Sequence, residues 1–117
     1  MNPGIAAAQS EVTVVIDYRA RPGNADACRR ELTALAAIVV EREPDCHGIE
    51  LLVDVDDPHR ILLVERWSSR AAYFGPHLET PYLNDFRERA AGFVAGPPEI
   101  RCWASCDSFA PARPRPA

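Results

Sequence analysis

Residues 48–67 read GIELLVDVDDPHRILLVERW, a stretch that predicts two strands joined by a tight turn. Apolar side chains dominate residues 48–54 and residues 60–67, and the turn-forming sequence Asp-Asp-Pro-His at residues 56–59 separates them. Side chains of a strand alternate between its two faces, so every second residue of the second strand lies on the same face. These are Ile61, Leu63, Glu65 and Trp67.

The segment before this hairpin predicts a strand followed by a helix. Residues 11–21 (EVTVVIDYRAR) are rich in β-branched side chains and end at a Pro-Gly pair. Asn24 is a typical helix cap, and a Glu-Pro-Asp sequence stops the helix near Arg42, because a residue before proline is pushed out of the helical conformation. Apolar side chains recur at three- and four-residue steps down one helix face: Ala25, Cys28, Leu32, Leu35 and Val39.

The segment after the hairpin predicts two helices and a last strand. Ser68 or Ser69 caps a short helix, which a Gly-Pro pair interrupts. A Thr-Pro pair at residues 80–81 has the pattern of an N-cap and a first-turn proline, so we expect a second helix running to about Val94. A Gly-Pro-Pro break then precedes the last strand at residues 99–106.

The order β-α-β-β-α-α-β predicts a ferredoxin-like α+β fold, a four-stranded antiparallel sheet with its helices on one face. The strands are apolar on both faces, as Val14 and its neighbour Val15 illustrate, whereas a sheet with one solvated face alternates more cleanly. We therefore expect the second face to pack on another subunit, giving a homodimer. The folded domain spans residues 11–107, between a disordered N-terminal tail (1–10) and a proline-rich C-terminal tail (108–117).

The composition is that of one soluble domain. The chain has 117 residues, 47% of them hydrophobic and 26% charged, and no run of about 18 apolar residues that would span a membrane. Its net charge of −4 argues against nucleic acid as a partner, and all 13 basic residues are arginine, which excludes Schiff-base lysine chemistry. The four cysteines lack metal-ligand spacing, and the N-terminus lacks the features of a signal peptide. We therefore expect a cytoplasmic protein without a metal site.

The polar side chains near Trp67 suggest one candidate pocket. Glu65, flanked by Leu63 and Trp67 on its strand face, lies either at an edge or against a cavity. The helices that follow bring four more polar or aromatic side chains close in sequence: Tyr73, His77, Tyr82 and Arg87. A mostly apolar pocket with a few polar groups is typical of a small-molecule site.

Each of these residues also has a purely structural interpretation. Trp67 and the tyrosines are common core residues, and Glu65 is a candidate for a surface ion pair with Arg66 or Arg87. His77, just after a Gly-Pro break, fits a capping or hydrogen-bonded structural histidine. The near-neutral pKa of histidine nonetheless suits proton transfer, and an inward-pointing Arg87 would pair with an enolate or phenolate.

Several motifs in the folded domain follow a known pattern. They are Arg-Pro-Gly at 21–23, Glu-Pro-Asp-Cys at 43–46, Glu-Arg-Trp-Ser-Ser at 65–69, His77, Thr-Pro-Tyr at 80–82, Phe86 and Gly-Pro-Pro-Glu-Ile at 96–100. Together they resemble the antibiotic biosynthesis monooxygenase family, over residues 12–104. The resemblance implies a ferredoxin-like protomer, a dimer joined through its sheets into an α/β barrel, and a pocket between sheet and helices in each subunit.

Within that family the pocket pattern resembles most the cofactor-free, quinone-forming oxygenases of aromatic polyketide pathways. Trp67, Tyr73 and Arg87 match three pocket residues of those enzymes in order and spacing, while Leu63 stands where they carry an asparagine. The haem-degrading branch carries an asparagine on the first strand, where this chain has Ile-Asp at residues 16–17, and this difference argues against haem. The resemblance thus implies an enzyme with no bound cofactor and with O₂ as co-substrate.

The function expected from this pattern is cofactor-independent monooxygenation in secondary metabolism, taking a small phenolic or polyketide-like substrate (anthrone or naphthol) to a quinone. His77 or Glu65 is the expected proton acceptor. Arg87 and Tyr73 hold the oxyanion, and Trp67 stacks on the substrate ring. The catalytic candidates are therefore His77, Glu65 and Arg87, and the substrate-binding candidates are Trp67, Tyr73, Tyr82, Leu63 and Phe86.

Two other functions fit the same pocket. A polyketide cyclase or isomerase would use the proton transfer but no oxygen, so its turnover would continue under anaerobic conditions. A non-catalytic, dimeric small-ligand-binding protein would use the aromatic side chains for affinity alone, and would bind its ligand without forming product. Fold-level resemblance does not by itself choose among the three.

Overall fold

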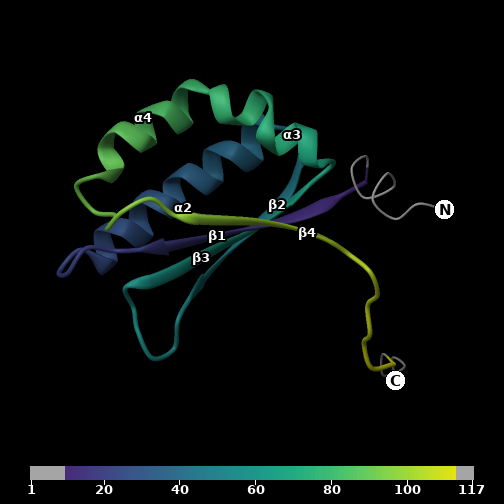
Figure 1. The fold of residues 1–117 in the computed structure, drawn as a ribbon, viewed down its shortest axis with the longest axis horizontal. Helices are drawn as coiled ribbons and strands as arrows, with labels where there is room; N and C mark the ends of the chain where they lie inside the picture. The colour runs from purple at the N-terminus through teal and green to yellow at the C-terminus, as the bar shows by residue number, and fades with distance from the viewer. Residues whose placement is uncertain (1–9, 113–117) are drawn as a thin grey trace, which may run out of the picture.

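The ferredoxin-like α+β fold predicted from the sequence is confirmed by a computed structural model, which describes residues 10–112 (Figure 1). Its elements are β1 (Val12–Arg19), α2 (Ala25–Arg42), β2 (Cys46–Val53), β3 (Arg60–Trp67), α3 (Arg70–Phe74), the short 3₁₀ helix η1 (Pro76–Glu79), α4 (Pro81–Ala90) and β4 (Glu99–Ala104). The predicted tails fall largely outside the described residues, except that residues 105–112 carry no helix or strand. No helix among residues 10–112 is long and apolar enough to cross a membrane.

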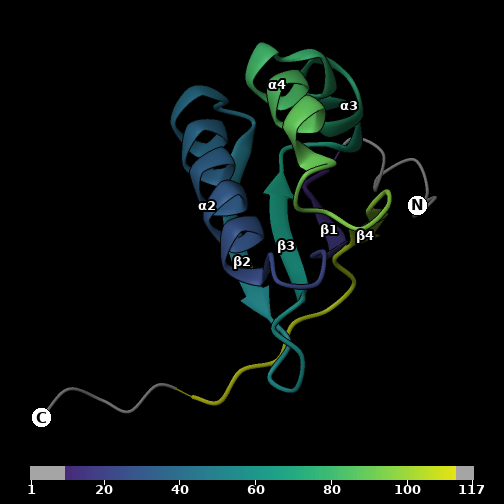
Figure 2. The same cartoon turned by 90° about the vertical axis from the view of Figure 1, so that its left-hand side faces the viewer.

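The four strands form one antiparallel sheet in the order β2-β3-β1-β4. Helices α2 and α4 contact each other and cover one face of this sheet (Figure 2). No helix of residues 10–112 lies on the other face, which we call the bare face. On the covered face the register places Val14 of β1 between Glu65 of β3 and Cys102 of β4. The predicted side-chain alternation of β3 is confirmed, since its four side chains on that face are all buried: Ile61, Leu63, Glu65 and Trp67.

Helix α2 begins and ends where the sequence predicts. The apolar stripe faces the sheet, and its buried members are Cys28, Leu32, Leu35 and Val39. Asn24 occupies the N-cap position but caps through its backbone, because its carbonyl oxygen accepts from the Cys28 N–H at 2.9 Å while its side chain makes no cap bond. At α3 the predicted cap is present, with the Ser69 hydroxyl accepting from the Ala72 N–H at 3.1 Å.

Helix α4 is shorter than the sequence predicts and ends at Ala90 instead of Val94. The reason is that the backbone after α4 forms hydrogen bonds with residues at the end of β1. The backbone of residues 93–95 turns toward the end of β1, where the Arg21 N–H donates to the Phe93 carbonyl and the Ala95 N–H donates to the Arg19 carbonyl. This turn brings the 96–98 loop back over the sheet and places it beside α4.

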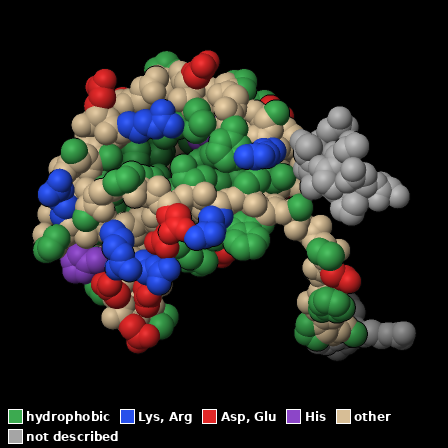
Figure 3. Space-filling view, viewed as in Figure 1, with side chains coloured by type: hydrophobic (Ala, Val, Ile, Leu, Met, Phe, Trp, Pro, Cys, Tyr) green, Lys and Arg blue, Asp and Glu red, His purple; other side chains and the backbone are tan. Residues whose placement is uncertain are grey.

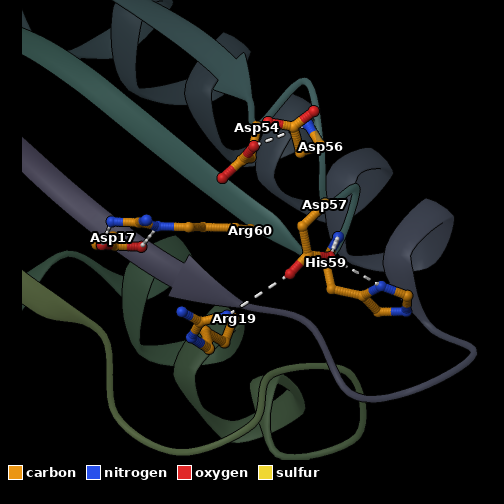
Figure 4. A network of polar contacts seen from close by, with 7 residues as sticks. All are labelled: Asp17, Arg19, Asp54, Asp56, Asp57, His59 and Arg60. Atoms are coloured by element: carbon orange, nitrogen blue, oxygen red, sulfur yellow. Dashed lines mark hydrogen bonds and ion pairs between the residues drawn. The ribbon is translucent and has the colours of Figure 1, made fainter.

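The turn between β2 and β3 is stabilised by its own aspartates (Figure 4). The Asp54 carboxylate accepts from the Asp56 N–H at 2.8 Å, and the Asp57 carboxylate accepts from the His59 N–H at 3.0 Å. Arg19 at the end of β1 approaches Asp57 to 3.7 Å. The Asp-Pro-His sequence therefore acts as a turn, as predicted, and His59 has a structural place in it.

The uncovered face of the sheet is apolar at its centre. The alternation puts Val15 of β1 and Val64 of β3 on this face, both half-buried by their neighbours. Two larger side chains on the flanking strands are more exposed, with Leu52 of β2 at 41% and Trp103 of β4 at 55%. Within the described residues, this face is therefore left uncovered.

Candidate functional site

A cavity of about 460 Å³ lies between the covered face of the sheet and the helices. Its floor comes from β1 and β3, its walls from α2, α3 and α4, and its rim from the loop at residues 96–98. Figure 3 shows the corresponding apolar hollow between the helical layer and β4, with basic side chains near its edge. The volume is in the range of small-molecule sites.

Glu65 is the buried acid of this cavity. Its side chain lines the cavity wall, is 3% exposed, and accepts a hydrogen bond from the Trp67 indole Nε1–H at 2.8 Å. Burial raises the pKa of the Glu65 carboxyl from 4.5 to about 7; the indole hydrogen bond opposes this rise and the nearby charge of Glu43 adds to it. Near neutral pH this carboxyl is therefore able both to accept and to return a proton.

Two tyrosine hydroxyls face the same space. Tyr18 of β1 and Tyr73 of α3 both line the cavity, and burial raises the pKa of each phenol well above its usual 10. Among residues 10–112, every fully buried side-chain oxygen has a hydrogen-bond partner, whereas these two hydroxyls have none. The two hydroxyls are therefore not fully buried. Both hydroxyls therefore open on the cavity, as neutral donors ready for a ligand.

Arg87 supplies the positive charge. From α4 it lines the cavity, and its guanidinium donates to the Leu78 carbonyl at 3.0 Å and to Asn84 Oδ1 at 3.4 Å. Its charge opposes the rise in the pKa values of Tyr18 and Tyr73, as expected of a cation that faces both phenols. Within the described residues no carboxylate forms an ion pair with it, so the charge remains available to an anion.

A packed group of rings forms one end of the site. The Trp67 indole lies with its centroid 4.5 Å from that of His77 and 5.6 Å from that of Tyr73, and the last two rings are 5.1 Å apart. His77 is 4% exposed, and its Nδ1 lies 2.9 Å from Glu43 Oε2. The same carboxylate oxygen accepts a hydrogen bond from the Tyr82 hydroxyl.

The structure brings most of the sequence-predicted residues together. Glu65, His77, Arg87 and Tyr73 line the cavity, joined by the two apolar candidates Leu63 and Phe86. The proton-accepting and substrate-binding roles expected of them stay predictions. Their common location follows from the packing of α3, η1 and α4 on the side of the sheet to which the cavity-lining residues of β3 point.

Two placements differ from expectation. Neither Trp67 nor Tyr82 is part of the cavity wall. The indole is 1% exposed, directs its N–H to Glu65 and packs on the neighbouring rings, so it lies behind the wall and supports it; its stacking on a substrate ring stays a prediction. Tyr82 is half-buried, and its hydroxyl is directed to Glu43. In both cases an acid, the buried Glu65 or the half-buried Glu43, accepts the hydrogen bond from the aromatic side chain.

Sequence reasoning missed Tyr18 and Glu43 as site residues. Tyr18 continues the alternation of Val14 and Ile16 on β1, so the period of two was a signal that it shares their face. Glu43 follows the last residue of α2, and nothing in its local pattern pointed to a histidine 34 positions later. Within residues 10–112, no group of three His, Cys, Asp or Glu side chains is arranged to hold a metal ion.

Comparison with known proteins agrees with this geometry. The model of the antibiotic biosynthesis monooxygenase family matches residues 11–89. An uncharacterised protein of Synechocystis, sll1783, is 26% identical over 102 residues, a match that covers 85% of this chain and 66% of that protein, just under two thirds of its length.

Solved structures show the same fold. PA3566 of Pseudomonas aeruginosa (26% identity, TM-score 0.75) covers 86% of this chain and 98% of its own, and Rv0793 of Mycobacterium tuberculosis (25%, 0.73) covers 86% and 100%. A Caulobacter crescentus protein named as an antibiotic biosynthesis monooxygenase (21%, 0.78) covers 92% and 100% and shares the fold. With the family match spanning more than half of the chain, this protein belongs to the antibiotic biosynthesis monooxygenase family.

Proposed function

We propose that this protein is a cofactor-independent monooxygenase that oxidises a small phenolic or anthrone-like substrate to a quinone with O₂. The observation that carries the proposal is Glu65, a buried carboxyl whose pKa of about 7 suits proton abstraction, on the wall of an otherwise largely apolar cavity. Two tyrosine hydroxyls with no hydrogen-bond partner among residues 10–112, and an arginine with no ion pair among them, line the same space. Family membership supports an oxygenase reaction without naming the substrate.

The first step is the removal of a proton. Glu65 takes one proton from the activated CH₂ carbon of an anthrone, and the negative charge spreads onto the substrate oxygen. Arg87 and the Tyr18 and Tyr73 hydroxyls are the groups on this wall able to hold that oxygen, because they offer donors and positive charge in a site of low dielectric constant. The protein thus makes the carbanion accessible near neutral pH.

Oxygen chemistry then proceeds on the substrate itself. The carbanion passes one electron to O₂, and the resulting radical pair recombines to a C–O bond, giving a peroxide that receives a proton. Loss of the second hydrogen from the same carbon, with cleavage of the O–O bond, leaves a C=O group and one molecule of water. The overall reaction converts CH₂ and O₂ into C=O and H₂O, so no external reductant or resident cofactor is needed.

We also propose that the working unit is a homodimer formed through the bare face of the sheet. The occupant we assign is a second copy of this chain, because the face has an apolar centre around Val15 and Val64. Charged pairs lie on the same face toward the sheet ends, Arg60 with Asp17 and Arg101 with Glu99, and suit a self-complementary contact about a two-fold axis.

Oxygen uptake tests the proposal. Purified protein, shown by metal and absorbance analysis to carry neither metal nor flavin, is mixed with an anthrone while an electrode records O₂ and chromatography records the quinone. We expect quinone and O₂ to change in equal amounts, and Glu65→Gln to lower turnover by about 10²-fold or more. Glu88→Gln, an exposed acid on α4, is the matched control.

Other outcomes assign other functions. Product formation that continues without O₂ identifies a cyclase or isomerase and refutes the oxygenase. Tight binding of aromatic ligands with no product from a broad panel of phenols and anthrones identifies a non-catalytic binder. Unchanged oxygen uptake in Glu65→Gln leaves the oxygenase standing but removes Glu65 as its base.

A further inference from the structure

A series of hydrogen bonds connects Tyr82 of α4 with the cavity. The half-buried Tyr82 donates its hydroxyl proton to Glu43 Oε2, and the same oxygen lies 2.9 Å from His77 Nδ1. His77 in turn lines the cavity. The three residues come from the end of α2, from η1 and from α4, so tertiary packing alone assembles them.

The donors in this chain determine which nitrogen of His77 carries its proton. Burial and the hydrogen bond to Glu43 raise the pKa of Tyr82 to about 12, so Tyr82 keeps its proton and acts as the donor. Glu43 Oε2 accepts the hydrogen bond from the Tyr82 hydroxyl. A carboxylate has no proton to donate, so His77 Nδ1, which lies 2.9 Å from the same oxygen, must carry the N–H. The other ring nitrogen, Nε2, is then the one with a free lone pair.

The cavity is the space available to Nε2. Within residues 10–112, every fully buried side-chain nitrogen has a hydrogen-bond partner, whereas Nε2 of His77 has none. Nε2 therefore meets open space, and the open space beside this 4%-exposed histidine is the cavity that it lines. Contacts with Trp67 and Tyr73 hold the ring plane in place, with centroids 4.5 and 5.1 Å away.

We propose that Glu43 is a positioning residue that holds His77 as the Nδ1–H tautomer, with Nε2 aimed into the cavity as a second base beside Glu65. The proposal rests on the proposed oxygenase function for its chemical purpose. That reaction removes two protons from one carbon at two different stages, and Glu65 returns the first of them to the peroxide. Nε2 takes the second as the O–O bond breaks, and then gives it to the leaving hydroxide, forming water. Glu43 stabilises the imidazolium that exists in between.

Nitrogen NMR on the full-length chain tests the tautomer without any substrate. In ¹⁵N-labelled protein at a pH where the rings are neutral, we expect a pyridine-like Nε2 and a pyrrole-like Nδ1 for His77, the reverse of the tautomer preferred by free histidine. The chain has three histidines, and a His77→Gln sample, which lacks one set of ring signals, assigns those of His77.

The variant Glu43→Ala sharpens the test, because it removes the acceptor of the Nδ1–H and leaves the ring to the Nε2–H tautomer that free histidine prefers. We expect the two ring nitrogens to exchange character in this variant and to stay as in the wild type in Glu41→Ala, an exposed acid of the same helix. Tyr82→Phe is expected to keep the wild-type tautomer, since Glu43 still accepts from His77. A wild-type His77 with its proton on Nε2, or a Glu43→Ala spectrum identical to the wild type, overturns the proposal.

Kinetics separate this inference from the proposed function. In the oxygen-uptake assay, Glu43→Ala is expected to lower kcat by about 10-fold to 100-fold with little change in KM, as removal of a supporting hydrogen bond does. Glu43→Asp, which restores a carboxylate, is expected to recover part of that loss. Absence of any turnover in the wild type refutes the oxygenase but leaves the tautomer result intact, and the wild-type spectrum alone decides the tautomer should a variant fail to fold.

Discussion

Replacing Glu65 with glutamine is expected to change how the stability of the protein depends on pH. The folded state raises the pKa of this carboxyl from 4.5 to about 7, mainly by burial. An acid with a raised folded-state pKa keeps its proton longer in the folded chain than in the unfolded chain. Its contribution to stability is therefore full below about pH 4.5 and is lost as the pH rises toward 7.

The size of the effect follows from the same two values. A tenfold change in an ionisation equilibrium corresponds to about 1.4 kcal/mol, so a rise from 4.5 to about 7 corresponds to roughly 3 kcal/mol of folding free energy. Glutamine cannot ionise, and its side-chain oxygen is able to keep the 2.8 Å hydrogen bond from the Trp67 indole. Any cost of its buried amide group is independent of pH and cancels in the comparison.

The assay is urea denaturation at about pH 4 and about pH 8, at one protein concentration, for wild type and Glu65→Gln. We expect the free energy of unfolding of the variant, minus that of the wild type, to be larger by roughly 3 kcal/mol at the higher pH. Glu88→Gln removes the same charge from an exposed site of α4 and is expected to show the pH dependence of the wild type. A difference between variant and wild type that does not change with pH, or that decreases as the pH rises, would refute the reasoning.

Three further predictions follow from the cavity and the bare sheet face. Tyr73→Phe removes a hydroxyl that has no hydrogen-bond partner among residues 10–112, so the thermal melting midpoint should stay near that of the wild type while oxygen uptake falls by about 10²-fold. A large loss of stability would contradict a hydroxyl that opens on the cavity. Arg87→Ala should weaken binding of the anionic dye anilinonaphthalene sulfonate by about tenfold in a fluorescence titration, and leave the affinity for the neutral N-phenylnaphthylamine unchanged. Equal losses of affinity for both dyes would show that the variant changes the shape of the cavity and not only its charge. Trp103→Glu places a charge on the bare sheet face and should shift the sedimentation coefficient to that of a monomer. The control Phe74→Glu, at an exposed aromatic side chain of α3, should leave the sedimentation coefficient unchanged. A wild type that sediments as a monomer would refute the proposed dimer.

The local elements and their faces were predictable because they depend on neighbouring residues. A period of two placed Glu65 and Leu63 on one face of β3, and steps of three and four residues identified the buried stripe of α2 from Cys28 to Val39. The turn at residues 56–59 was equally predictable, since the carboxylates of Asp54 and Asp57 accept from backbone N–H groups only two positions away. The end of α4 was not, because the backbone of residues 93–95 bonds to the distant end of β1.

The site as a functional unit was decided by tertiary structure. Glu43 meets His77 across 34 positions, and Tyr18 of β1 faces Tyr73 of α3 only because the helices pack on that side of the sheet. The raised pKa of Glu65 likewise depends on how completely other elements exclude water from it. Sequence periodicity specifies on which face of its own element a side chain lies. Which distant group it contacts, and how completely water is excluded from that contact, depends on the packing of helices against the sheet. The chain alone therefore determined the fold and its faces, and the packed structure decided that Trp67 supports the cavity wall while Glu65 and His77 open on the cavity.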